Sequence, residues 1–460
     1  MTFASGNDMN TEQQYGDSGV RQAFPATRSA ARPHVAIIGA GLSGLACARH
    51  LTLADIPFTI VEADDAVGGR VRTDIVNGFR LDRGFQVFLE AYPEAMRVLD
   101  YHRLRLRRFY PGAIVRAAGG FHLCPDPWRK PEHLLAGALS PIGSLRDKLR
   151  VLNLRREVLK RSIGSLFAEP EISTMEYLRQ RGFSERMIQR FFVPFYGGVF
   201  LDRDLSSSAR MFLFLFRMFA MGHASVPEAG MGAIPAQLAG HIAPGRLRVG
   251  AAAQEIHEGA VQLSTGHELL ADHIVVATER GECNWLTKAN HGVGSRAVAC
   301  LYFAVPRQPF RHGAVILNGE GEGMIHNMAF MSQVSPSYGK GAEHLLSVTV
   351  LPPFPKRDHE VIQQVRENLR AWFGDPALRW RHLKTYRINQ AQPILRAGVL
   401  DQVHRTRELS DGTIVCGDHC DTVSINGALT SGRHAAELVM KRAGVTESIC
   451  SPSRPGHILS

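Results

Sequence analysis

Residues 34–45 read HVAIIGAGLSGL, and this stretch decides the fold of the first part of the chain. His34–Ile38 is an apolar run of strand length, and a glycine-rich turn separates it from a helix expected over Leu45–Ala54. Phe58–Val61 follows as a second short apolar run. A strand, a helix and a strand within about 30 residues predict a compact βαβ unit.

The glycines of the turn have the spacing of a dinucleotide-binding motif. Gly39 allows the tight turn out of the strand, Gly41 lets the backbone approach a pyrophosphate, and Gly44 lets the helix pack closely on the strand. The phosphates would then lie at the positive end of the helix. Glu62 stands 18 residues after Gly44, at the end of the second strand. A carboxylate there suits a ribose diol and disfavours a 2′-phosphate.

A second motif favours FAD over NAD. Residues 63–73 read ADDAVGGRVRT, so that Gly68, Gly69 and Arg70 follow shortly after Glu62. Two glycines let the main chain pass the diphosphate on its second side. Arg70 would supply a forked set of donors for phosphate oxygens.

These residues resemble the FAD-dependent amine oxidase superfamily, which includes flavin amine oxidases, protoporphyrinogen oxidases and phytoene-desaturase-like carotenoid enzymes. The combination of GAGLSGL, Glu62 and GGR is specific, and the resemblance extends over most of residues 34–440. It implies that Asp82–Gln86 runs beside the isoalloxazine, that the strand starting at Ala253 meets the adenine, and that Asp418 with the following helix closes the flavin site. The residues expected to bind FAD are Gly39, Gly41, Leu42, Ser43, Gly44, Glu62, Ala63, Gly69, Arg70, Gly84, Phe85, Gln86, Ala253, Ala277, Gly417, Asp418, Ile425, Asn426 and Ala428.

The positions that would face the substrate depart from the amine-oxidising members. By the resemblance, an aromatic cage for the amine would fall on Ser424 and near Ala391 and Gln392, where the sequence has no tyrosine. The stretch Arg296–Val305, which would carry a lysine near the flavin N5, contains none. Oxidation of a primary amine is therefore in doubt, and the resemblance is closer to the desaturase-like and uncharacterised branches.

The expected fold class is α/β and α+β, with a Rossmann-like FAD-binding domain assembled from discontinuous segments and an interleaved substrate domain of mixed sheet and helices. A chain of 460 residues is too long for one compact core. The FAD-binding domain is expected over 33–90, 230–295 and 396–442, and the substrate domain, with a helical part, over 91–229 and 296–395. Polar tails are expected at 1–32, which is predicted to be disordered, and at 443–460.

Further elements follow from short apolar runs. Strands are expected at Arg246–Ile256, Gly259–Leu263, His273–Ala277, Val298–Val305, Leu345–Leu351 and Thr413–Cys416. Helices are expected over Glu360–Phe373 and Gly427–Met440, and also across the mixed polar sequence from Tyr92 to Phe219.

Charge and composition limit the class of protein. The net charge is +10, with basic residues concentrated in Arg103–Arg108 and Arg146–Arg161. The second run is either a solvated helix face or a basic amphipathic helix for peripheral contact with an anionic membrane. No apolar run is long enough to span a bilayer, and no motif indicates nucleic acid. Seven scattered cysteines suggest a reducing, cytoplasmic location, and no metal site is predicted.

The predicted function is that of an FAD-dependent oxidoreductase that transfers hydride from a small, apolar substrate to the flavin N5. No catalytic residue can be assigned from the sequence. The electron acceptor would be O2, a quinone or a redox partner, because the chain shows no second dinucleotide motif. Two alternatives stay open: an amine or porphyrinogen-type oxidase that uses O2, and a non-catalytic flavin-binding protein at a membrane surface.

Overall fold

The computed structural model describes residues 33–133, 140–292, 294–400 and 407–445. The tails expected at 1–32 and, for the greater part, at 443–460 lie outside these described residues.

The N-terminal βαβ unit forms the centre of a six-stranded sheet. β1 (Val35–Ile38) is buried along its whole length and pairs in parallel with β2 (Phe58–Val61) and with β14 (His273–Val276). Val35 lies opposite Phe58 on one side and His273 on the other. The order of strands is β10 (Leu247–Arg248), β2, β1, β14, β21 (Ile414–Val415) and β20 (Arg407–Glu408). Because these strands come from the start, middle and end of the chain, the domain is assembled from discontinuous segments, as predicted.

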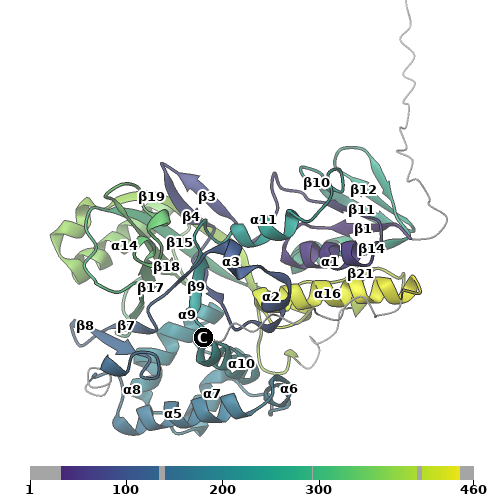
Figure 1. Cartoon of the computed structure of the whole chain (residues 1–460). Helices are drawn as coiled ribbons and strands as arrows, with labels where there is room; N and C mark the ends of the chain where they lie inside the picture. Colours follow the sequence, from purple (N-terminus) through teal and green to yellow (C-terminus); the bar gives the residue numbers. More distant parts are fainter. Residues whose placement is uncertain (1–32, 134–139, 293, 401–406, 446–460) are drawn as a thin grey trace, which may run out of the picture.

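Both faces of this sheet are covered. α1 (Leu42–Leu53) and α16 (Ile425–Arg442) lie side by side on one face (Figure 1). They approach so closely that a Cβ on Gly432 of α16 would come within 2.1 Å of the Ser43 carbonyl oxygen on α1. α11 (Ala233–Ala239) packs beside α1, and α12 (Arg280–Thr287) follows β14. The other face packs on an antiparallel sheet of β11 (Ala253–His257), β12 (Ala260–Leu263) and β13 (Glu268–Leu270).

A seven-stranded mixed sheet forms the second layer of the molecule. Its order is β19 (Arg381–Pro393), β15 (Ser295–Val305), β18 (His344–Val350), β17 (Ile325–Phe330), β16 (Val315–Asn318), β7 (Gly112–Ala117) and β8 (Gly120–Pro125). α14 (Asp358–Phe373) covers its outer face through Val361, Val365 and Leu369. The inner face, which includes Cys300 and Leu317, belongs to the large core shared with the cofactor-side elements.

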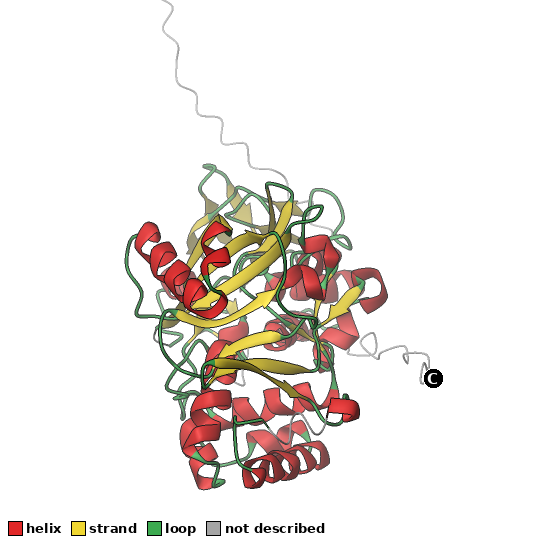
Figure 2. Cartoon of the chain, turned by 90° about the vertical axis from the view of Figure 1, so that its left-hand side faces the viewer, coloured by secondary structure: helices red, strands yellow, loops and turns green. Residues whose placement is uncertain are grey.

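Helices gather at the end of the molecule away from the six-stranded sheet (Figures 1 and 2). They are α5 (Leu145–Lys160), α6 (Ile163–Phe167), α7 (Thr174–Gln180), α8 (Glu185–Met187), α9 (Val193–Phe200) and α10 (Ala209–Met221). α10 reads ARMFLFLFRMFAM and is buried over most of its surface, as an almost wholly apolar helix must be. α5 begins at a capping box in which Ser144 and Asp147 bond to each other's backbone N–H groups.

Small elements join the two layers. They are β3 (Thr73–Val76) with β4 (Phe79–Asp82), the set β5 (Phe88–Leu89), β9 (Ala224–Pro227) and β6 (Leu106–Arg108), and the helices α2 (Pro93–Val98), α3 (Tyr101–Leu104) and α13 (Met331–Val334). Buried Asp82 at the end of β4 joins β3, the turn after α13 and the turn before α11, because its carboxylate accepts hydrogen bonds from Thr73 Oγ1, Tyr338 Oη and Met231 N. α2 packs on α16 through a Glu94–Arg433 ion pair of 3.0 Å, although it follows the domain boundary expected at residue 90.

The fold class is the predicted one, whereas several strands differ from expectation. β6, β7 and β8 lie within Tyr92–Phe219, where the sequence analysis expected helices. β7 pairs in parallel with β16, about 200 residues further along the chain, so its partner is not visible locally. Within the described ranges, no helix combines the length and apolarity that a bilayer span requires.

Candidate functional site

A cavity of about 880 Å³ runs from the carboxyl ends of β1 and β2 to the helices α9 and α10. The carboxyl ends of parallel strands are the usual place for a ligand in this kind of sheet. Of the residues expected to bind FAD, all line this cavity except Gly44 and Asn426. The sequence therefore brings widely separated motifs to one space.

The N-terminus of α1 opens into the cavity. Gly39 has φ 103°, which an L side chain rarely adopts, and it turns the chain from β1 into the helix. Gly41 is the N-cap, no side chain caps the helix, and a Cβ placed on Gly41 would meet no atom within 4 Å. The first N–H groups of α1 thus face open space, which suits a pyrophosphate.

Glu62 lies beside that helix end. Its Oε2 accepts the Ala40 N–H at 2.6 Å and its Oε1 accepts the Asp64 N–H at 3.0 Å. These two bonds fix the carboxylate at the cavity wall and leave further lone pairs for a ribose hydroxyl.

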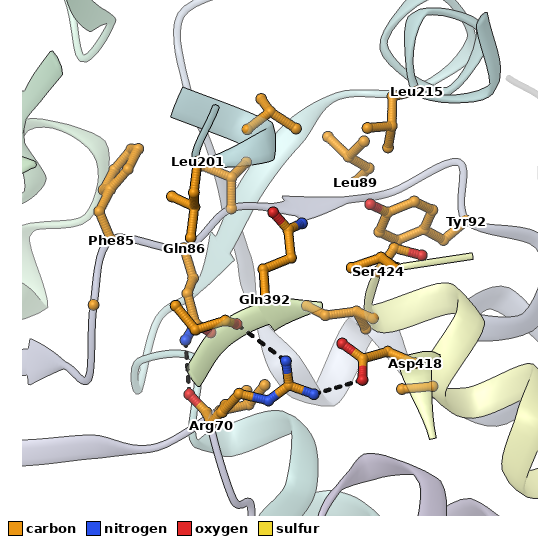
Figure 3. A pocket seen from close by; sticks show the side chains of 18 of the residues that line it. Arg70, Phe85, Gln86, Leu89, Tyr92, Leu201, Leu215, Gln392, Asp418 and Ser424 are labelled. Carbon is orange, nitrogen blue, oxygen red and sulfur yellow. Dashed lines mark hydrogen bonds and ion pairs between the residues drawn. The ribbon is translucent and has the colours of Figure 1, made fainter. Parts of the chain in front are cut away.

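Arg70 and Asp418 meet across the cavity, although 348 positions separate them in the sequence. Arg70 Nη2 donates to Asp418 Oδ1 at 2.6 Å, and Nη1 donates to the Ala391 carbonyl at 3.0 Å (Figure 3). Burial raises the pKa of the Asp418 carboxyl, but the charge and hydrogen bond of Arg70 outweigh it and hold that pKa below its usual value. The guanidinium thus bonds a carboxylate and a carbonyl, which differs from the phosphate contact expected of Arg70.

Two buried side-chain oxygens at this end of the cavity have no hydrogen-bond partner among the described residues. Gln86 donates through Nε2 to the Arg70 carbonyl at 2.7 Å, while its Oε1 has no hydrogen-bond partner among the described residues. Thr278 Oγ1, just after β14, is also buried and is unpartnered within the described part of the chain. Buried polar groups are normally hydrogen-bonded, so these atoms indicate a bound polar ligand.

Gly44 and Asn426 do not line the cavity, and each makes a packing contact instead. A Cβ on Gly44 would come within 2.0 Å of the Gly39 carbonyl oxygen, so this glycine lets α1 pack on the end of β1. Asn426 Oδ1 accepts the Glu94 N–H at 2.9 Å and ties α16 to α2. Ile425 and Ala428, one before and two after Asn426, do line the cavity at the N-terminus of α16.

Comparisons with known proteins agree with this geometry. The profile of the flavin-containing amine oxidoreductase family matches residues 42–440. The chain belongs to this family. It is 32% identical over 169 residues to protoporphyrinogen oxidase 2 of Arabidopsis thaliana, covering 36% of this chain and 32% of that one. It is 28% identical over 232 residues to phytoene dehydrogenase of Streptomyces griseus, covering 45% of each. The matches therefore span about a third to a half of the length of these curated relatives. In fold, the chain is similar to a double mutant of putrescine oxidase, with a TM-score of 0.68, 16% identity and coverage of 90% of this chain and all of that one.

FAD is the cofactor of this chain, and the residues present fit it. The uncapped α1 N-terminus with open space at Gly41 suits the diphosphate, and Glu62 suits a ribose. The N-terminus of α16, capped by Ser424 through the Gly427 N–H, points its partial positive charge at the same cavity. Ala253, at the start of β11, lines the cavity where the resemblance places the adenine.

The far part of the cavity is an apolar chamber. Figure 3 shows Leu89, Tyr92, Leu201 and Leu215 on one side of Gln392, with Arg70 and Asp418 on the other. Further aromatic and aliphatic walls come from α9, α10 and the turn before α9, namely Phe191, Phe195, Tyr196, Val199, Phe216 and Phe219. Ser424 lines the chamber next to Tyr92, and burial raises the pKa of the Tyr92 hydroxyl while its bond to Ser424 offsets part of that rise.

Sequence reasoning missed the wall that the seven-stranded sheet contributes. Val298, Leu317, Asn327, Thr349 and Ile388 line the chamber from five different strands. Their meeting depends on strand register, which the sequence does not display. The available signal was the presence of polar residues inside largely apolar strands, as in IHNMAF for Asn327 and HLLSVTV for Thr349.

Proposed function

We propose that this chain oxidises a largely apolar molecule by taking hydride from a substrate carbon, with FAD as the acceptor. The observation that carries the proposal is the continuity of the cavity. One space joins the cofactor end to a chamber with aliphatic and aromatic walls. Moving an apolar molecule from water to such walls is favourable by about 25 cal/mol for each Å² of apolar surface that is buried.

The chain's own residues exclude water and balance charge. Phe195, Phe216 and Phe219 close the chamber with aromatic rings, and Phe195 packs edge-on against Phe219 with ring centres 5.2 Å apart. Among the described carboxylates of the cavity, Asp126 lies at the chamber end, and it pairs with Arg129 at 3.2 Å. Bound FAD supplies the electron acceptor for the hydride.

The test is an anaerobic screen of the purified, FAD-loaded protein. Loss of the flavin absorbance near ~450 nm is followed with an isoprenoid hydrocarbon, a porphyrinogen and a polyamine. The proposal expects bleaching by the isoprenoid. Bleaching by the polyamine alone would contradict it and favour an amine oxidase, and a flavin that no substrate or reductant bleaches would favour a non-catalytic flavoprotein.

We further propose that α5 places the chamber against an anionic membrane surface. Leu145 and Leu149 expose 67% and 59% of their surface, and Arg146 and Arg156 share this exposed face. On the neighbouring face of α5, Val151 and Arg155 line the cavity, where Arg155 lies over the Trp128 ring at 4.5 Å. A basic and apolar helix face beside the chamber would bring a lipid-like substrate close to it.

Sedimentation with phosphatidylglycerol vesicles tests this contact. The double variant L145E/L149E should lose vesicle binding, because it replaces two exposed apolar side chains with negative charges that anionic lipid repels. L378E is the control, since Leu378 exposes 46% of its surface on a distant turn after α14. Equal binding by the three proteins would exclude α5 as the contact.

A further inference from the structure

Two polar side chains face each other on the sheet wall of the chamber. Asn327 on β17 lies directly opposite Thr349 on β18 in the antiparallel register. Both side chains are buried, with 5% and 3% exposure, and both line the cavity. Directly opposite residues of an antiparallel pair point to the same face, so they act as one feature of the wall.

A strand irregularity and a glycine set the position of this pair. The register shifts between Ile325 and Asn327, so that His326 is an extra residue in β17. Such bulges re-aim side chains and are frequent beside active sites. On the helix side, a Cβ at Gly198 of α9 would come within 2.2 Å of Asn327 Nδ2, so a larger residue there would displace the amide from this position.

The oxygens of the pair are unsatisfied. Asn327 Oδ1 and Thr349 Oγ1 are buried and have no hydrogen-bond partner among the described residues. The other side chains in this row of the sheet differ, because Leu317 is apolar, Cys300 already bonds Ser347 Oγ at 3.3 Å, and Tyr386 donates to Asp74 Oδ2 at 2.7 Å. Val298 and Ile388, which pair with each other in a neighbouring row, are apolar. A buried polar group without a partner is costly, so its persistence in an apolar wall points to a ligand atom that bonds it.

We infer that Asn327 and Thr349 form a neutral hydrogen-bonding subsite, which binds an uncharged oxygen group, a hydroxyl or a carbonyl, of an otherwise apolar substrate. This inference rests on the proposed function and specifies its substrate class. The amide and the hydroxyl together offer donors and acceptors, so they can bond either oxygen group. They carry no charge, so a carboxylate or an ammonium placed against them would lose its hydration without gaining a counter-ion.

The test measures binding to the FAD-loaded protein by the change that a ligand causes in the flavin absorbance spectrum. The probes are farnesol and farnesene, a C15 alcohol and a C15 hydrocarbon. The wild type should bind farnesol on the order of 10-fold more tightly than farnesene, the value of one recovered hydrogen bond. Thr349→Val and Asn327→Leu should abolish that preference by weakening farnesol binding alone. Thr349→Ser, which keeps the hydroxyl, should retain it.

A second measurement does not depend on the probes. Thr349→Val removes a hydroxyl that has no partner in the described chain and keeps the side-chain shape, so it should raise the melting temperature of the FAD-loaded protein. A purely structural hydroxyl would give a lower melting temperature, and that result would overturn the subsite. Equal binding of farnesol and farnesene by the wild type would overturn the subsite alone. Binding of neither compound would overturn the proposed function and the subsite with it.

Discussion

Gly41→Ala should weaken FAD binding and leave the FAD-free protein as stable as the wild type. Gly41 has φ −72° and ψ 179°, an extended conformation open to any residue. A Cβ placed on it meets no atom within 4 Å. In the absence of cofactor, the added methyl group therefore lies in the cavity and strains no contact.

With FAD the same methyl group occupies the space through which the pyrophosphate approaches the first N–H groups of α1. Hydrogen bonds to a charged group contribute about 1.5–3 kcal/mol each, so the loss of one or two is expected to cost about 3 kcal/mol. That free energy corresponds to a Kd raised on the order of 100-fold.

Gly44→Ala is the matched control, one helical turn further along α1. A Cβ there would come within 2.0 Å of the Gly39 carbonyl oxygen and 3.2 Å of its carbon, which are backbone atoms. The main chain at the end of β1 would have to shift, so this variant should destabilise the FAD-free protein itself, by about 1–3 kcal/mol or more.

Denaturant unfolding with and without FAD separates the two effects. At an FAD concentration of 100 times the wild-type Kd, binding adds about 2.7 kcal/mol to the free energy of unfolding of the wild type. The same concentration should add only about 0.4 kcal/mol to Gly41→Ala, because it then equals the raised Kd. An equal FAD-induced gain in both proteins would refute the reasoning, as would an FAD-free Gly41→Ala as unstable as Gly44→Ala.

Three carboxylates give further expectations for stability. Asp418→Asn leaves Arg70 without its counter-ion and should lower the free energy of unfolding by about 1–2 kcal/mol. The loss is smaller than for a fully buried pair, because Arg70 keeps 34% of its side chain exposed. Chemical denaturation measures this free energy. Burial raises the pKa of Asp82 from 3.8 to about 6, so the folded protein retains that proton longer than the unfolded chain. The free energy of unfolding should therefore fall by about 2 kcal/mol as the pH rises from 4 to 6. The difference in melting temperature between the wild type and Asp82→Asn should narrow across the same pH range. Asp147 shows the opposite sign: burial raises its pKa, but hydrogen bonds from Ser144 and Ser184 outweigh this and lower it to about 2. The ionised Asp147 should add about 2 kcal/mol to the free energy of unfolding above pH 4, and this stabilisation should be lost as the pH falls to 2. Asp147→Asn should remove this pH dependence when melting temperatures are measured over the same pH range.

The parts of the fold that the sequence predicted well are those with local causes. β2 has the expected bounds and β1 begins one residue later than expected, because an apolar run, a glycine turn and a helix follow each other within one short segment. The strands that were missed depend on distant partners. β19 reads RHLKTYRINQAQP, which shows no apolar alternation, and it is held by pairing along β15 at the edge of the sheet.

The same division holds for the site. Gly39 and Gly41 could be assigned to the cofactor end from the sequence, because local geometry requires glycine at both positions. Gly39 makes the tight turn out of β1, and Gly41 leaves space for the diphosphate to approach the backbone. The pairing of Arg70 with Asp418, and of Asn327 with Thr349, follows from tertiary contacts and strand register, which no local pattern contains.

Three arginines that line the cavity each pair with a carboxylate, and these pairs bear on which substrates the cavity can bind. Arg70 pairs with Asp418, Arg83 with Asp74, and Arg129 with Asp126. A carboxylate that already has a guanidinium partner offers little to an ammonium group, which would lose its hydration on entering an apolar chamber. An uncharged molecule has no such loss and gains from the burial of its apolar surface. We therefore expect desolvation to disfavour protonated amines in the chamber. The neutral polar pair of Asn327 and Thr349 then becomes the feature of the sheet wall that can orient an uncharged substrate toward the cofactor end.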